Sequence, residues 1–327
     1  MKKAAGICLL AATVITQSCG FGNREMASDT IGVLVSPEEN REYSYTDKKA
    51  GYWYGTTHQE KTEWWTGWNM AKKRILADYA IGVDDPAIGS DLTLNRKDAL
   101  ECVVYPDRIV RGWGHTQETF QMLDNTPILS IDLVSIADSL FIVPDLSHIS
   151  EVKDSEHGMF LTPTEAPDMN ILIAPARKTG FVRFGDGIKA GADSDGFIMT
   201  YGTEDECIAL ADLYRKSGRQ MMKERKERIS GLITDYNYVK TNLPSLDSAL
   251  NWITITMDEL ITEQQGKGIY AGLPWFNEYW GRDMFISFPG ACLVTGQFET
   301  AKQILKDFAQ LQDTDPASET YGRIPNR

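Results

Sequence analysis

A short stretch of the chain, residues 272–283, combines aromatic rings with charged groups that can form hydrogen bonds. Flat aromatic rings stack on the apolar C–H faces of sugars, and carboxylate and guanidinium groups bind sugar hydroxyls in a bidentate manner. These residue types side by side therefore predict a sugar-binding segment. Its candidate binding residues are Trp275, Glu278, Trp280, Arg282 and Asp283.

The elements that must position this segment are helices, with irregular backbone between Pro274 and Gly281. Apolar residues recur at helical spacing over 246–261, 284–293 and 298–311, and loops on a helical scaffold are where binding residues collect. A structural alternative is that Asp283 is simply the N-cap of the helix beginning near Met284, with Arg282 as its ion-pair partner.

A further helix is predicted from Thr203, which forms a capping box with Glu206, to about Ile229. The basic stretch Lys223 to Arg228 on this helix is interrupted by glutamates, a pattern typical of a solvated helix face.

The region from 43 to 202 reads as strands, because short runs rich in Val, Ile, Phe and Tyr alternate with turn signals and show no helical period. This spacing predicts an antiparallel β-sandwich. The predicted strands are Arg74–Val83, Leu100–Tyr105, Arg108–Gly112, Thr116–Leu123, Ile128–Val134, Ser139–Val143, Asn170–Pro175, Gly180–Phe184 and Gly196–Tyr201.

The N-terminus predicts export. Two lysines precede the apolar run Ala4 to Ile15, as in a signal peptide, and Cys19 follows a box typical of lipoprotein cleavage sites. We expect Cys19 to carry a lipid that anchors the protein to a bacterial membrane, facing the periplasm or cell surface. Cleavage without lipidation is the alternative, because Gln17 is not an ideal box residue.

Composition excludes several classes of function. The 327 residues are 42% hydrophobic and carry a formal net charge of −13 with no long basic run, so we expect no nucleic-acid partner. The scattered histidines and cysteines predict no metal site and no cofactor. Three cysteines of the expected mature chain should be buried small hydrophobes: Cys102, Cys207 and Cys292.

The C-terminal part resembles the start of the catalytic domain of bacterial and archaeal glycogen debranching enzymes of the amylo-α-1,6-glucosidase type. The resemblance runs over 246–327 and is ordered and fairly specific. It rests on Ala271-Gly272-Leu273-Pro274-Trp275-Phe276, Trp280-Gly281-Arg282-Asp283, Phe288-Pro289-Gly290, Thr295 to Ala301 and Gly322-Arg323-Ile324-Pro325-Asn326-Arg327.

The resemblance implies a β-sandwich, linker helices and then an (α/α)6 barrel that hydrolyses α-1,6-glucosidic branches of glycogen- or starch-derived glucans with inversion. It gives Arg282 and Asp283 the role of holding glucose, with Trp275 or Trp280 as a platform. Arg323, Asn326 and Arg327 would line the same pocket from a second loop.

The sequence departs from that family in one respect, because it predicts far fewer helices than six hairpins and ends in a recognisable loop. Inversion needs two carboxylates about 6.5–9.5 Å apart. The resemblance places them beyond residue 327, which leaves Glu278 and Asp283 as weak catalytic candidates. We therefore expect a truncated chain with the glucose-binding half of the site and without glucosidase activity, which a second chain could complete.

The expected organisation is a signal peptide (1–18), a lipoprotein tether (19–42), a β-sandwich (43–202), a linker helix region (203–245) and the start of an (α/α)6 domain (246–327). Another inverting exo-glycosidase, of trehalase or glucoamylase type, remains open. So do a glucan-binding lipoprotein that does not cleave and a remnant that does not fold stably.

Overall fold

The computed structural model describes residues 26–59, 65–85, 90–236 and 239–326. The predicted signal peptide, Cys19 and Arg327 lie outside these ranges. None of the helices in the described ranges combines the length and the apolar composition that crossing a bilayer requires.

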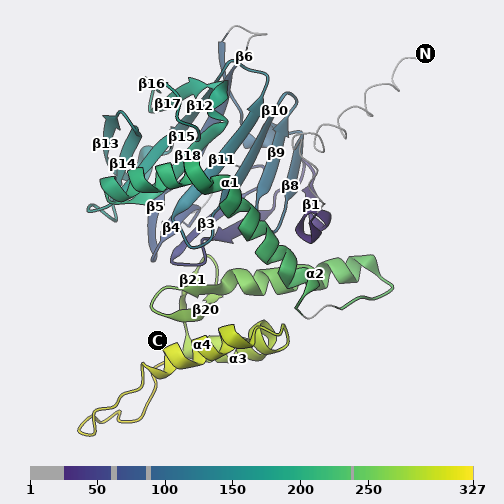
Figure 1. The fold of residues 1–327 in the computed structure, drawn as a ribbon, viewed down its shortest axis with the longest axis vertical. Helices are drawn as coiled ribbons and strands as arrows, with labels where there is room; N and C mark the ends of the chain where they lie inside the picture. Colours follow the sequence, from purple (N-terminus) through teal and green to yellow (C-terminus); the bar gives the residue numbers. More distant parts are fainter. Residues whose placement is uncertain (1–25, 60–64, 86–89, 237–238, 327) are drawn as a thin grey trace.

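The largest element is a nine-stranded antiparallel sheet in the N-terminal half of the chain (Figure 1). It contains strands far apart in sequence, since β11 pairs with β18 and β18 pairs with β15. In spatial order the strands are β1 (Val33–Val35), β8 (Glu101–Val104), β9 (Ile109–Trp113), β10 (Thr116–Met122), β11 (Ile128–Ser135), β18 (Gly196–Gly202), β15 (Asn170–Pro175), β14 (Gly158–Pro163) and β13 (Ile149–Ser155).

Two smaller antiparallel sheets complete this β region, which spans residues 33–202. One contains β16 (Phe181–Phe184), β17 (Gly187–Gly191), β12 (Ser139–Pro144), β6 (Tyr79–Asp85) and β7 (Ser90–Thr93). The other contains β2 (Glu42–Thr46), β3 (Gly51–Thr56), β4 (Gly67–Met70) and β5 (Lys73–Leu76).

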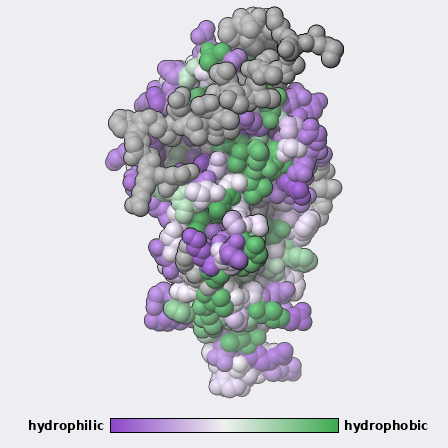
Figure 2. All heavy atoms as spheres, turned by 90° about the vertical axis from the view of Figure 1, so that its right-hand side faces the viewer, coloured by the Kyte–Doolittle hydropathy of each residue, from purple (hydrophilic) through white to green (hydrophobic). Residues whose placement is uncertain are grey.

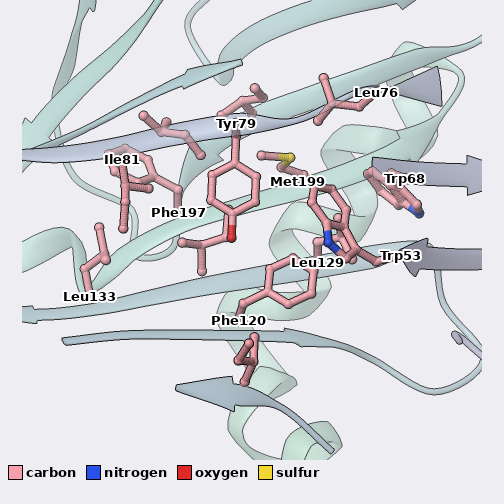
Figure 3. Close-up of a cluster of buried hydrophobic side chains, with 14 of the residues drawn as sticks. Trp53, Trp68, Leu76, Tyr79, Ile81, Phe120, Leu129, Leu133, Phe197 and Met199 are labelled. Atoms are coloured by element: carbon pink, nitrogen blue, oxygen red, sulfur yellow. The ribbon is translucent and has the colours of Figure 1, made fainter. Parts of the chain in front are cut away.

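One buried core joins the three sheets. Trp53, Tyr79 and Phe120 come from different sheets and their rings lie within 5.0–6.1 Å of one another (Figure 3). Successive residues of a strand point to opposite faces, so Ile173 of β15 joins this core while Leu172 joins a second cluster behind the large sheet. This layering is consistent with the predicted antiparallel β-sandwich.

Helix α1 (Glu204–Thr234) covers that second face of the large sheet. The predicted capping box is confirmed, with Thr203 and Glu206 bonded reciprocally, and the helix runs five residues past the predicted end at Ile229 to Thr234. The Tyr214 hydroxyl lies 2.7 Å from Ser130 Oγ of β11, which fixes the helix on the sheet.

A smaller helical part follows α1 and lies beyond one end of the β region (Figure 1). Its helices and two of its strands pack on one apolar cluster that includes Ile269, Met284 and Ile304. The elements are α2 (Pro244–Leu260), β19 (Ile261–Glu263), β20 (Lys267–Gly272), β21 (Phe276–Tyr279), α3 (Gly281–Phe288), the π-helix η6 (Pro289–Leu293) and α4 (Phe298–Ala309). In the described residues these helices do not form an (α/α)6 barrel.

The three predicted buried cysteines are confirmed as free and buried. Each lies in a different apolar cluster: Cys102 in the core between the sheets, Cys207 under α1, and Cys292 in the helical part. Burial raises the pKa of each thiol to about 11.

Two expectations about local structure were wrong. The segment before Gly281 is not simply irregular, because β19, β20 and β21 form a small antiparallel sheet there. Helix α3 begins at Gly281, so Asp283 lies in its first turn and Trp280 occupies the N-cap position. Acidic side chains in a first turn are stabilised by the helix dipole without acting as caps.

The predicted tether also differs from the structure. The 3-10 helix η2 (Ala27–Ile31) packs near α1, and β1 pairs with β8 at the edge of the large sheet. Residues 27–35 are therefore part of the fold rather than a free linker.

The basic stretch of α1 is a solvated face only in part, because Lys223 and Glu227 are exposed as predicted but its arginines are not. Arg225 is 1% exposed and pairs with Asp124 and Glu259, and Arg228 pairs with Asp124 and Asp258. Opposite charges on neighbouring elements explain the difference, because a sequence shows only the charges on the helix itself.

Candidate sugar-binding site

The N-terminus of α3 is closed by a residue far along the chain. The backbone N–H of Gly281 donates to the carbonyl of Asn326 at 2.7 Å, and the N–H of Arg282 donates to Asn326 Oδ1 at 2.8 Å. The first N–H groups of a helix have no partner within it, and Trp280 supplies no side-chain cap. Asn326 therefore does the work of a cap and brings the last described loop against Arg282.

Gly281 lets Phe308 of α4 approach the start of α3 closely. A Cβ atom at this position would lie 2.7 Å from the ring of Phe308, so a larger residue would require this ring to shift, whereas its distance of 3.5 Å from Asn326 Cα would be an ordinary contact.

A groove of about 520 Å³ opens where α3, α4 and this loop meet. Its walls are mainly apolar, with the guanidinium residue Arg282 and the amide residue Asn326 among them. It is lined by Gly281, Arg282, Phe285, Leu305, Phe308, Ala309, Ile324, Pro325 and Asn326. The structure thus brings together Arg282 and Asn326, which the sequence analysis assigned to two loops of one pocket.

Other predicted residues lie near the groove without lining it. Asp283 is exposed in the first turn of α3, and Arg323 is exposed in the loop that precedes Asn326. Trp280 is half-buried between β21 and α3. Arg327 lies outside the described residues.

The loop after α4 is organised by Asp313, a residue that no motif in the sequence indicated. Its Oδ2 accepts hydrogen bonds from Ser318 Oγ at 2.5 Å and Thr320 Oγ1 at 2.6 Å. These hydrogen bonds hold the pKa of Asp313 below its usual value. The Asp313 N–H also donates to the Arg323 carbonyl at 2.8 Å, which closes the loop on itself.

Trp275 lies in the turn between β20 and β21 and is 58% exposed. The base of this turn is buried: Asn277 is 4% exposed, and its Nδ2 donates to the Tyr52 hydroxyl of β3 at 2.9 Å. The turn therefore presents an indole to solvent while its base is fixed to the β region.

Glu278 has a partner that the sequence did not indicate. Its carboxylate forms an ion pair with Lys72, in the turn between β4 and β5. The Glu278 side chain is 15% exposed. This ion pair links the Glu278 carboxylate to the β region. Tyr52 and Lys72 stand more than two hundred residues from their partners, and nothing in their local sequence signals these contacts.

The fold and groove define a mixed protein, in which an antiparallel β region precedes a helical part that carries an open groove. Residues 218–326 match the family model described as amylo-alpha-1,6-glucosidase. The match supports a glycoside hydrolase of the glycogen debranching type, in agreement with the resemblance in the sequence. It includes the second half of α1 and every element from α2 to α4. No curated protein matches the chain.

Proposed function

We propose that this protein is an exported glycoside hydrolase of glycogen debranching type, acting on α-1,6-glucosidic branches of glycogen- or starch-derived glucans by an inverting mechanism. The observation that carries the proposal is the groove at the start of α3, which lies inside the region matched by the amylo-alpha-1,6-glucosidase model. Its volume falls within the range of small-molecule sites, about 300–1,000 Å³.

The groove residues suit the binding of a terminal glucose. The Arg282 guanidinium can donate two hydrogen bonds to neighbouring hydroxyls, while Phe285 and Phe308 supply apolar surface for the C–H face of the ring. Asp283, the exposed residue that follows Arg282 in the first turn of α3, would accept hydrogen bonds from sugar hydroxyls in this proposal.

Binding and bond cleavage make different demands on the chain. Inversion requires a general acid and a general base on opposite sides of the scissile bond. Of the two weak candidates, Glu278 is engaged by Lys72, and neither Glu278 nor Asp283 lines the groove. This arrangement favours a second candidate function for the chain alone, in which it binds glucan without cleaving it.

The catalytic groups would then come from further helices of an (α/α)6 barrel, in a longer form or in a second chain. Supporting this, α3, the turn after η6 and α4 expose large apolar side chains such as Ile286, Val294 and Phe298, which are 76%, 61% and 63% exposed. Figure 2 shows hydrophobic residues on the surface of this end of the molecule. Exposed apolar surface of this kind marks interaction sites.

The binding proposal is tested by isothermal titration of the full chain with linear and α-1,6-branched maltooligosaccharides. We expect Arg282→Ala and Asp283→Asn to weaken binding at least tenfold, since charged hydrogen bonds are worth about 1.5–3 kcal/mol. The matched control is Arg219→Ala, an exposed arginine of α1 that should leave binding unchanged. Unaltered binding in both groove variants would place the sugar elsewhere.

A glucose-release assay on the same chain separates the two candidates. Binding without glucose release supports the non-cleaving form, whereas release above a buffer control shows that the chain holds its own acid and base. Export and anchoring are tested by the mass of the mature N-terminus, which should carry lipid on Cys19 and lose it in Cys19→Ser.

A further inference from the structure

The exposed Trp275 is displayed by a turn whose two ends are anchored to the β region. The hydroxyl of Tyr52, in β3, donates to the Pro274 carbonyl at 3.4 Å and accepts from Asn277 Nδ2 at 2.9 Å. Tyr52 is 1% exposed and Asn277 is 4% exposed. One buried phenol therefore clamps the residues on both sides of Trp275 and Phe276.

A second anchor lies next along the chain. Lys72 forms an ion pair with Glu278, which directly follows Asn277. Lys72 belongs to the tight turn between β4 and β5, where Ala71 and Lys72 have φ values of 46° and 72°. The cation is thus presented by a well-defined hairpin turn and not by a long loop.

The two anchors come from neighbouring strands of the same four-stranded sheet. β3 carries Tyr52 and pairs with β4, and the β4–β5 turn carries Lys72. The aromatic turn therefore takes its position from this sheet as well as from the helical part to which it belongs in sequence. Aromatic side chains bind sugars well only when they are held in place, because ordering a free loop on binding costs affinity.

We propose that Tyr52 and Lys72 are positioning residues of the sugar site, and that the β region thereby sets where Trp275 meets a glucan. The ligand is a pyranose ring of the glucan that stacks on the Trp275 indole. Neither positioning residue touches the sugar. This inference rests on the proposed function, since it assigns the β region a part in the same site.

The test compares two anchor variants with matched controls in the full chain. Tyr52→Phe removes one buried hydroxyl, and Tyr45→Phe is its control, because the Tyr45 hydroxyl donates to the Tyr105 carbonyl at 2.8 Å within the β region. Lys72→Gln removes the cation, Lys72→Arg retains it, and Lys73→Gln changes the neighbouring exposed lysine.

Two readouts are measured: maltooligosaccharide affinity by titration and amide hydrogen exchange over residues 273–279. We expect Tyr52→Phe and Lys72→Gln each to weaken binding about three- to tenfold and to speed exchange in this segment. Tyr45→Phe, Lys73→Gln and the rescuing Lys72→Arg should stay near wild type in both readouts.

The outcomes separate the inference from the function on which it rests. A wild-type chain that binds no maltooligosaccharide overturns the proposed function, and the inference with it. A wild-type chain that binds, with affinity unchanged in Tyr52→Phe and Lys72→Gln, overturns the inference alone. Faster exchange in those variants would not rescue it, because the anchors would then order the turn without serving the sugar.

Discussion

The pKa of Asp47 shows how strongly the position of a side chain in the fold can change its acidity. It lies in the turn between β2 and β3, where Oδ1 accepts from the N–H groups of Lys49 at 2.8 Å and Gly51 at 3.0 Å. Its Oδ2 is buried without a hydrogen-bond partner. Burial raises the pKa of Asp47 to about 7, although these N–H groups and Arg225 lower it.

Charged groups from two other elements also act on this carboxyl. Asp124, in the β10–β11 turn, raises its pKa, while Arg225 of α1 lowers it. Asp47 in turn raises the pKa of Tyr270 in β20. Electrostatic interactions therefore connect Asp47 with the β region, with α1 and with the small sheet of the helical part.

This environment predicts a pH dependence of stability. The folded pKa of about 7 exceeds the unfolded value of 3.8, so the native state binds more protons between these values. Stability from this residue is thus present below about pH 4 and lost as pH rises through 7, by about 4 kcal/mol in total. Asp47→Asn should remove this loss, because the amide stays neutral and keeps an acceptor for the two N–H groups.

The measurement is urea unfolding of wild type and Asp47→Asn at pH 5 and pH 8. We expect the variant to gain stability relative to wild type at both pH values, and the gain at pH 8 to be more than twice the gain at pH 5. Asp132, whose pKa burial raises to about 6, contributes equally to both proteins and cancels in the comparison. The exposed Asp212→Asn serves as control, and equal pH slopes in wild type and Asp47→Asn would refute the assignment.

At the level of single residues, the sequence predicted the types of side chain in the site better than their partners. Arg282 and Asn326 could be placed together because both occur in motifs of one resemblance. The contacts of Glu278 with Lys72 and of Asn277 with Tyr52 could not, since they join strands and turns that only the folded chain brings close.

Among the elements, α1 connects the two parts of the molecule. Its N-terminal half packs on the large sheet, and its C-terminal half packs with α2 and η2 (Figure 1). Between these halves, Arg225 donates to the Thr46 carbonyl at 3.0 Å and pairs with Asp124 and with Glu259 at 3.1 Å. One guanidinium therefore joins a strand, a turn and α2.

Removing the Arg225 guanidinium should lower the stability of the protein. Arg225→Met fills much of the same volume but removes the buried cation that Asp124 and Glu259 share, and we expect a loss of about 3–5 kcal/mol in the free energy of unfolding. Chemical denaturation measures it. Arg219→Met, on the exposed part of the same helix and 3.8 Å from Asp195, should change stability by less than about 0.5 kcal/mol. Equal losses in the two variants would contradict this role.

Elements with a clear periodicity were predictable, and short strands were not. The helices α1, α2 and α4 follow apolar stripes or a capping box, and most predicted strands differ from the observed ones by one or two residues. The predicted strand Arg74–Val83 is in fact two strands, β5 and β6, in different sheets. Strands that the sequence did not reveal depend on partners distant in sequence: β1, β2, β3, β4, β7, β13, β14 and β17, with β19, β20 and β21 in the helical part.

The small sheet of the helical part shows why short strands were not predictable from the sequence. Gly266 turns with a φ of 87°, and the N–H of Lys267 donates to Asp307 Oδ2 of α4 at 2.7 Å. Strands this short are stabilised by such tertiary contacts rather than by their own propensity. A sequence pattern therefore gives little sign of them.

For the whole molecule, apolar surface is concentrated on the helices furthest from the large sheet. Ile286 is 76% exposed on α3, so Ile286→Glu should change stability by less than about 0.5 kcal/mol. We expect it to reduce binding of a hydrophobic dye and concentration-dependent self-association, because it places a charge within an apolar face. Analytical ultracentrifugation measures the second effect.

The control is Val182→Glu, an equally apolar, 62% exposed residue on the edge strand β16 of the β region. It should leave self-association unchanged. If both substitutions reduced association to the same extent, net charge and not the helical face would be responsible.

The three buried thiols can serve as probes of local opening in three different parts of the molecule. Each reports on a separate packing unit, since Cys102, Cys207 and Cys292 belong to different clusters. A thiol buried with a pKa of about 11 is protected from alkylating reagents until its surroundings open. In single-cysteine versions of the chain, the rate of alkylation would time the opening of the sheet core, the α1 interface and the helical part independently. It would show whether the helical part opens while the rest of the molecule stays closed.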